Sequence, residues 1–194
     1  MAPAVTQVQT LYSAVARLAN LQNRVAAPVV SSPNMPTIYE AAGGEAGLLR
    51  LARAWHARVM SDDVVSHAFS HGFHPEHVER LAGYWMEALG GPAAYSTAYG
   101  NETSVVRMHS GNGPHEEMDH RAVACFDQAL ADVGLDRDDR VRQVLHDYFE
   151  WATTCAMARY HESAADVPDD LEIPRWSWGG LVSTHESADR STLA

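Results

Sequence analysis

Histidine is the side chain through which this chain is best equipped to do chemistry. The 194 residues include eleven histidines and no lysine. An imidazole changes its charge near neutral pH and binds metal ions through a neutral ring nitrogen. His77 falls in the first turn of a predicted helix, and His109 falls in a loop bounded by glycines. These two histidines are therefore the first candidates for a ligand-binding site.

The residues around them are mostly apolar or aromatic. Leu81 and Tyr84 follow His77 at spacings of four and three residues, so the three side chains share one face of a helix. His56 lies on an earlier predicted helix, and Phe69 ends a short one. Axial ligation of a haem iron requires one histidine on a short constrained segment and another on a facing helix, with apolar walls between them.

The elements that must position these residues are all helices, so the predicted fold class is all-α. Apolar residues recur every three or four positions, without the alternation of a strand. Ser61-Asp62-Asp63 would end one helix and cap the next, and Gly90 and Gly134 would end two others. Residues 93–102 are expected to form a loop. The predicted helices cover about residues 48–61, 64–69, 75–89, 114–133 and 138–155.

A boundary precedes the helical part. Acidic residues first appear at Glu40, and the turn-rich run 31–36 lies just before it, so the residues up to 36 form an extension that is flexible or one amphipathic helix. Near the other end, Trp176 and Trp178 suggest that part of a polar tail docks on the body. The predicted parts are an extension at 1–36, a helical domain at 37–162 and a partly docked tail at 163–194.

The composition limits the classes of partner that the chain can bind. Apolar residues make up 46% and charged residues 20% of the chain, as in an ordinary soluble protein. The net charge of -11 argues against nucleic acid or an anionic membrane as a partner, and no apolar run is long enough for a spanning helix. Cys125 and Cys155 lack zinc-type spacing and are expected to be buried thiols, with Cys155 facing inward, in a reducing, cytoplasmic compartment.

Three segments resemble one known family. They occur in the order Ile38-Tyr39-Glu40-Ala41-Ala42-Gly43-Gly44, then Gly90-Gly91-Pro92-Ala93-Ala94-Tyr95-Ser96, then Arg107-Met108-His109. Their order and spacing over about residues 37–160 resemble the truncated haemoglobins, and most closely group II. The resemblance implies a globin-like fold, a truncated two-over-two helical sandwich that encloses haem b.

The same resemblance implies roles for individual residues. His109 matches the proximal iron ligand, and its other ring nitrogen is expected to bond to a backbone carbonyl in the same turn. Phe69 and Leu81 match residues that pack on the haem, and His77 matches the distal position. His56 stands where the family usually has tyrosine. Ala122 stands where group II usually has tryptophan, so both departures fall in the distal pocket.

Four further residues complete the cofactor-binding set. Arg80 and Arg107 are expected to pair with the haem propionates, because a guanidinium group suits a carboxylate. Tyr84 shares the helix face of His77, and Tyr95 belongs to the second matching segment, although Tyr95 could equally serve to pack the loop.

The implied function is the binding of dioxygen, nitric oxide, carbon monoxide or peroxide. Redox chemistry such as nitric oxide dioxygenation or peroxide reduction is favoured over transport, with His77 and His56 as the catalytic residues. An external, electron-donating reductase is then required, because the chain has no nucleotide-binding Gly-x-Gly-x-x-Gly signature. A homodimer is one possible assembly.

Two alternatives stay open. His77 or His56 could bind the iron as a sixth ligand, which would give a bis-imidazole protein for electron transfer or gas sensing. A helical protein could also bind a non-haem metal at a histidine-rich corner. The corner comprises His67, His71, His74 and His77, but Gly72 and Pro75 interrupt the helix that would align them.

Overall fold

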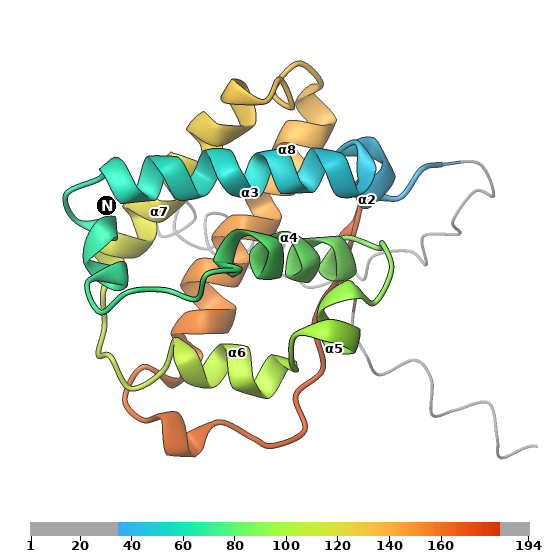
Figure 1. Ribbon diagram of the computed structural model, residues 1–194. Helices are drawn as coiled ribbons and strands as arrows, with labels where there is room; N and C mark the ends of the chain where they lie inside the picture. Colours follow the sequence, from blue (N-terminus) through green and yellow to red (C-terminus); the bar gives the residue numbers. More distant parts are fainter. Residues whose placement is uncertain (1–34, 183–194) are drawn as a thin grey trace, which may run out of the picture. The chain divides into compact units, whose positions relative to one another are not determined.

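Helices make up most of the regular structure, as the apolar periodicity predicts. The structure is a computed structural model that describes residues 35–182 (Figure 1). The predicted N-terminal extension and the last part of the tail lie outside the described residues, except for positions 35 and 36. The α-helices are α2 (Ile38–Ala41), α3 (Gly44–Ser61), α4 (His77–Ala88), α5 (Ala94–Ala98), α6 (Glu102–Met108), α7 (Glu116–Asp132) and α8 (Asp139–Trp151).

Two pairs of long helices form the predicted two-over-two sandwich. Figure 1 shows α3 and α4 side by side in front of α7 and α8, and contacts join α3 to both α4 and α7. Aromatic rings fill the space between the pairs. Phe126 of α7 and Phe149 of α8 stack with ring centroids 4.1 Å apart, and Trp55 of α3 and Trp85 of α4 contact Phe149 edge-on at 5.5 Å and 5.9 Å.

The helix-end signals act where the sequence places them. The Asp62 carboxylate accepts the backbone N–H groups of Val64 and Val65 at 2.9 Å and 2.8 Å, which ends α3 and starts the 3₁₀ turn Val65–Phe69. Gly134 adopts a φ of +75° just after α7, a conformation that glycine reaches at little cost. These two turns end α3, which carries His56, and the long α7, and they set the direction of the chain that follows each helix.

Two sequence expectations are wrong, and the tail contains an element that the sequence did not predict. The expected loop at 93–102 contains helix α5. The tail contains an antiparallel hairpin of β1 (Arg175–Ser177) and β2 (Gly180–Val182). Cys155 is exposed rather than inward-facing. The reason is that α8 ends at Trp151 and continues as a π-helical turn, Ala152–Ala156, which rotates the following side chains away from the face that a 3.6-residue period extrapolates. Shorter 3₁₀ turns follow at Met157–Tyr160 and Ala164–Asp166.

The tail lies along α6 and is hydrogen-bonded to Thr103 and Arg107 of that helix. The Thr103 hydroxyl donates to the carbonyl of Pro168 at 2.8 Å and accepts the N–H of Leu171 at 3.1 Å. The Arg107 guanidinium donates to the carbonyl of Val167 at 3.1 Å and to the carboxylate of Asp169 at 2.6 Å. The tail therefore binds α6 at both of its turns.

The hairpin anchors the tail to α4 and α8. The Arg175 guanidinium donates to the carbonyl of Glu87 and reaches its buried carboxylate at 3.3 Å. Trp176 packs its ring against Tyr148 and Trp151 of α8, with centroids 5.9 Å and 5.3 Å apart. The Trp178 indole N–H donates to the carbonyl of residue 36 at 2.8 Å, which joins the hairpin to the start of the domain.

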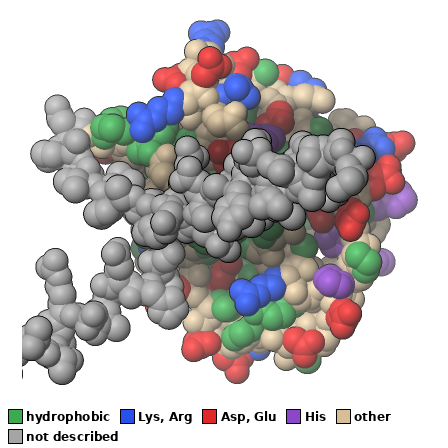
Figure 2. All heavy atoms as spheres, turned by 180° about the vertical axis from the view of Figure 1, so that it is seen from behind, with side chains coloured by type: hydrophobic (Ala, Val, Ile, Leu, Met, Phe, Trp, Pro, Cys, Tyr) green, Lys and Arg blue, Asp and Glu red, His purple; other side chains and the backbone are tan. Residues whose placement is uncertain are grey.

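The visible face in Figure 2 carries acidic side chains over much of its described surface, in keeping with the net charge of -11. None of the helices within residues 35–182 combines the length and the apolar character that crossing a bilayer requires.

We expect Arg175→Ala to destabilise the fold by about 1–3 kcal/mol, because the carboxylate of Glu87, 5% exposed, loses its charged partner. Urea unfolding measures the change. Arg142→Ala is the matched control, since Arg142 and Asp139 form an exposed pair at 3.8 Å that is worth less than about 1 kcal/mol. Equal effects of the two substitutions would show that the hairpin does not depend on Arg175.

Candidate functional site

Four aromatic rings from four segments form one cluster, which we call the ring cluster. It consists of His56 on α3, Phe69 at the end of the 3₁₀ turn, Phe73 in the following loop and His77 at the start of α4. All six pairs of rings lie in contact, with centroids between 4.8 Å and 5.9 Å apart. The predicted residues His56, Phe69 and His77 are therefore brought together, and Phe73 joins them.

The two imidazoles of the ring cluster are held neutral and unpaired. Within residues 35–182, the buried atoms His56 Nδ1 and His77 Nε2 have no hydrogen-bond partner. Burial lowers the pKa of His56, and it lowers the pKa of His77 to about 4, with further lowering from the charges of His56 and His109. Buried polar atoms without partners are costly, and functional sites are where such a cost is retained.

His109 follows the last residue of α6 and has one ring nitrogen fixed. Its Nδ1 lies 2.8 Å from the carbonyl oxygen of Val105, one turn back along the helix. A carbonyl only accepts, so Nδ1 carries the proton and Nε2 keeps its lone pair, as a metal ligand requires. Burial lowers the pKa of His109, which favours the neutral ring, although the residue is exposed by its solvent-accessible surface. Protein atoms therefore surround the ring without covering it.

His77 at the start of α4 and His109 at the end of α6 lie within electrostatic reach of each other. The charge of His109 contributes to the lowered pKa of His77. Leu81, one turn after His77, is half-buried next to the core. Neutral imidazoles with available nitrogens on two helices, beside apolar side chains, can hold a metal-centred planar cofactor and a small ligand.

The predicted tyrosines lie deeper, away from the ring cluster. Tyr84 and Tyr95 are buried and contact each other edge-on, with centroids 5.5 Å apart. The Tyr84 hydroxyl donates to the carboxylate of Glu102 at 2.7 Å, so it connects α4 to α6. Tyr95 also contacts Tyr99 at 5.9 Å.

The two predicted arginines differ in how far they are already engaged. Arg107 is bound by the tail through Asp169 and Val167. Arg80 places its guanidinium 5.2 Å from the ring centre of Tyr99, and its Nε, which is buried, has no partner within residues 35–182. Of the two, Arg80 has the greater unused capacity to bind an anionic group.

Trp55 and Ala122 are hydrogen-bonded to each other. The Trp55 indole N–H donates to the carbonyl of Ala122 at 3.1 Å, and both residues are buried. The Trp55 N–H is therefore already used. Ala122 contributes only a methyl group, and the unpartnered buried imidazole nitrogens within residues 35–182 are those of His56 and His77.

Sequence reasoning missed Phe73 and Glu102. Phe69, Phe73 and His77 recur every four residues, a spacing that could have indicated a common surface, but Gly72 and Pro75 argued against a helix there. Glu102 stood at the end of the loop expected at 93–102. Only its burial against Tyr84 marks it as unusual, and burial of a carboxylate has no sequence signal.

The histidine-rich corner does not form a metal cage in the described part of the chain. Across residues 35–182, no group of three or more His, Cys, Asp or Glu side chains is arranged to hold a metal ion. His67, His71 and His74 are exposed, whereas His77 turns toward the ring cluster. The non-haem alternative therefore has no supporting geometry in this region.

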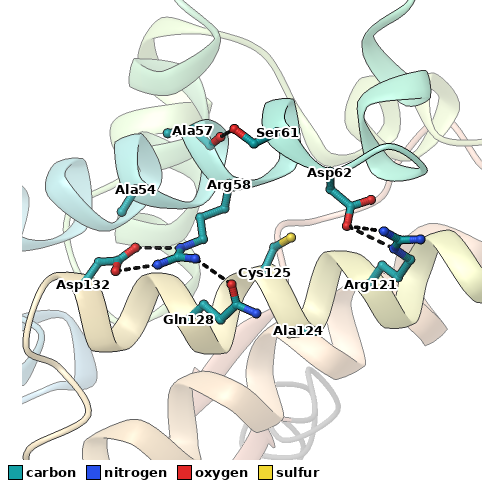
Figure 3. A pocket seen from close by; sticks show the side chains of 10 residues that line it. All are labelled: Ala54, Ala57, Arg58, Ser61, Asp62, Arg121, Ala124, Cys125, Gln128 and Asp132. Carbon is teal, nitrogen blue, oxygen red and sulfur yellow. Dashed lines mark hydrogen bonds and ion pairs between the residues drawn. The ribbon is translucent and has the colours of Figure 1, made fainter.

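A separate groove of about 530 Å³ lies between α3 and α7 (Figure 3). Its charged side chains are already hydrogen-bonded to partners within the groove. Arg58 forms a bidentate pair with Asp132 and also donates to Gln128, and Arg121 pairs with Asp62. The ring cluster and His109 do not line this groove.

Comparison with known proteins identifies the fold. The bacterial-like globin family matches residues 37–153. The haemoglobin of Chloroflexus aurantiacus is 30% identical, with a TM-score of 0.53, and the match covers 63% of this chain and 98% of that one. The haemoglobin of Thermobifida fusca is 30% identical, with a TM-score of 0.52, covering 63% and 96%. The group II truncated haemoglobin of Bacillus anthracis is similar in fold, at 19% identity and a TM-score of 0.55, covering 71% and 97%. Comparison with curated proteins gave no match.

The chain belongs to the bacterial-like globin family, and the resemblance to truncated haemoglobins is confirmed. Its fold is all-α and globin-like. Membership implies a haem cofactor and the binding of diatomic gases such as dioxygen.

We expect His77 to make the fold sensitive to acid. Its folded-state pKa of about 4 lies below the ordinary histidine pKa of 6.5, so the unfolded chain takes up the proton first. The stability that this neutral ring contributes is complete above pH 6.5 and is lost as pH falls toward 4. His77→Leu should flatten that part of the pH profile of urea unfolding, and nuclear magnetic resonance titration of His77 should show no protonation at pH 6. An unchanged profile would contradict this prediction.

Proposed function

We propose that this globin binds haem b through His109 and that His77 and His56 control the binding and reaction of dioxygen, nitric oxide, carbon monoxide or peroxide. One observation carries the proposal. The Nδ1 of His109 is fixed by Val105, which leaves Nε2 as a ligand atom, and His77, whose Nε2 is unpartnered like Nδ1 of His56, lies within electrostatic reach of His109.

The surrounding residues fit the cofactor. Bound haem would supply an iron that takes up diatomic ligands and exchanges electrons. Phe69, Phe73 and Leu81 offer apolar contacts for the macrocycle. Arg80 is the better candidate for a propionate because its Nε has no partner in residues 35–182, whereas Arg107 would have to leave Asp169.

His77 is suited to proton chemistry at neutral pH. Because burial keeps its ring neutral, one nitrogen can accept a proton from peroxide, and the other can donate a hydrogen bond to a ligand. Peroxide reduction takes two electrons and two protons to give two water molecules, and nitric oxide dioxygenation takes one electron to give nitrate. Both reactions require an external electron donor such as a reductase, so we propose that the protein works in a reducing compartment such as the cytoplasm.

A second candidate function is supported by the same unpartnered nitrogen. His77 Nε2 is buried and neutral, so it could bind the iron as a sixth ligand. The protein would then transfer electrons or sense gases. The absorption spectrum of the haem-loaded ferrous protein separates the candidates, because sharp low-spin bands without added ligand support the bis-imidazole form.

We expect His109→Gly to lose haem or to retain it only with added imidazole. Another histidine cannot replace the ring without movement of α6, whose Val105 carbonyl orients Nδ1. The Soret absorbance per protein, with and without imidazole, measures the effect. His115→Gly is the control, since His115 bonds to Asp119 instead. Normal haem content and an unchanged ferrous spectrum in His109→Gly would refute the assignment.

We expect His77→Leu to speed oxygen release about ten- to hundredfold, because a hydrogen bond to the bound ligand is worth about 1–3 kcal/mol. The double variant His56→Leu, His77→Leu should exceed the faster single variant. Stopped-flow oxygen and carbon monoxide kinetics measure both. His71→Leu is the control, because His71 is exposed and outside the ring cluster.

The same kinetics test the alternative. If His77 occupies the sixth position, its removal should instead speed carbon monoxide entry. Rates within about twofold of the parent in all the variants would show that neither His77 nor His56 controls the ligand, since a lost hydrogen bond would change them more.

A further inference from the structure

A hydrogen-bonded phenol and carboxylate connect the two helices that carry the candidate ligand histidines. Tyr84 lies seven residues after His77 on α4, and Glu102 lies seven residues before His109 on α6. Seven residues are close to two helical turns, so each member of the pair lies on the same face as the histidine of its helix. The hydrogen bond of 2.7 Å between Tyr84 Oη and Glu102 Oε2 therefore joins α4 and α6 about two turns away from His77 and His109.

Burial makes the negative charge of this pair unfavourable. Tyr84 is 6% exposed and Glu102 is 4% exposed. Burial raises the pKa of Glu102 to about 7, against the lowering effect of the Tyr84 hydrogen bond, and it raises the pKa of Tyr84 well above its usual value. A process that moves the phenolic proton onto Glu102 while an electron leaves would replace a buried anion by two neutral groups. Protonation of Glu102 in such a process removes the free-energy cost of keeping a charged carboxylate away from water.

Two more phenols lead from Tyr84 toward the surface. The ring of Tyr84 contacts that of Tyr95 at 5.5 Å, and Tyr95 contacts Tyr99 at 5.9 Å. Tyr99 is half-buried and lies under the guanidinium of Arg80. A third neighbour, Tyr148, is buried with its hydroxyl unpartnered within residues 35–182, so it has no group to take its proton.

We infer that Tyr84 is a redox-active residue for peroxide reduction, with Glu102 as its proton acceptor and Tyr95 and Tyr99 as the path to a small one-electron donor at the surface. The inference rests on the proposed function, since the electron reaches peroxide through the haem that the site binds. It adds a redox role that the ring cluster cannot fill, because the imidazole and phenyl rings of that cluster are much harder to oxidise than a phenol.

The oxidant is hydrogen peroxide, whose O–O bond breaks as it takes two electrons and two protons to form two water molecules. Each oxidation of Tyr84 breaks its O–H bond, forms an O–H bond on Glu102 and leaves a neutral phenoxyl radical. A donor such as a small phenol, written AH, then gives an electron through Tyr99 and Tyr95 and releases its proton to solvent, which replaces a proton that peroxide takes up, while Glu102 returns the phenolic proton to Tyr84. Over two such cycles, H₂O₂ and two AH give two H₂O and two A•.

The test is freeze-quench electron paramagnetic resonance of the haem-loaded full chain after addition of hydrogen peroxide, with ring-deuterated tyrosine to identify phenoxyl signals. Tyr84→Phe should lose the early signal. Glu102→Gln keeps a hydrogen-bond acceptor but cannot take the proton, so the radical should form about 100-fold more slowly. Tyr148→Phe is the matched control and should leave the signal unchanged, because that hydroxyl lacks an acceptor.

A second readout does not need haem. Infrared difference spectra of the haem-free chain should show a protonated carboxyl band that titrates near pH 7 and is absent in Glu102→Gln. The radical yield of the parent should fall with this protonation as pH drops. The other titratable groups facing Glu102 are Tyr84 of α4, Tyr95 of α5 and Tyr148 of α8, which are neutral in this range because burial raises their pKa values, and the Arg80 guanidinium lies near Tyr95.

The outcomes separate this inference from the proposed function. Haem uptake and peroxide consumption with an unchanged radical in Tyr84→Phe would overturn the inference alone. A radical rate in Glu102→Gln equal to that of the parent would also overturn it. A chain that takes up no haem, or consumes no peroxide, would overturn the peroxide role and this inference together.

Discussion

A helix of seven residues has to hold His109 in a fixed position, and the rest of the site depends on this constraint. So short a helix is not stable by itself in water. It is held at its start by Asn101, whose side chain accepts the N–H of Ser104 at 2.9 Å. Glu102 ties it to α4 and Thr103 ties it to the tail. Because these bonds fix the backbone, the carbonyl of Val105 can in turn fix the His109 ring.

The site retains polar groups that the rest of the domain would pair. His56 and His77 keep buried nitrogens without partners in the described residues, and Glu102 is a buried carboxylate. Their effects on stability oppose each other. Stability from neutral His77 is lost as pH falls from 6.5 toward 4, whereas the burial of Glu102 costs stability as pH rises from 4.5 toward 7. The histidine nitrogens are costly because they lack partners, and the Glu102 carboxylate is costly because it is buried, although Tyr84 donates a hydrogen bond to it.

The fold was predictable because its signals are local. Apolar spacing identified the long helices, and Asp62 and Gly134 marked turns that the structure contains. The errors arose where local signals stop. The π-helical turn after Trp151 changes the period, so Cys155 faces outward. The tail hairpin is short and depends on distant partners such as Glu87, which no pattern within the tail could reveal.

The sequence by itself determined the family and the long helices, and it indicated which histidines are candidates for the site, because these inferences follow from residue spacing along the chain. It also indicated that His109 needs a backbone acceptor. Tertiary structure alone decided which side chains meet. Phe73 joins His56 and His77 through a loop, Glu102 meets Tyr84 across two helices, and both contacts depend on how separate segments pack. Burial and proximity across segments are properties of the folded chain, and they set the protonation states on which the proposed chemistry depends.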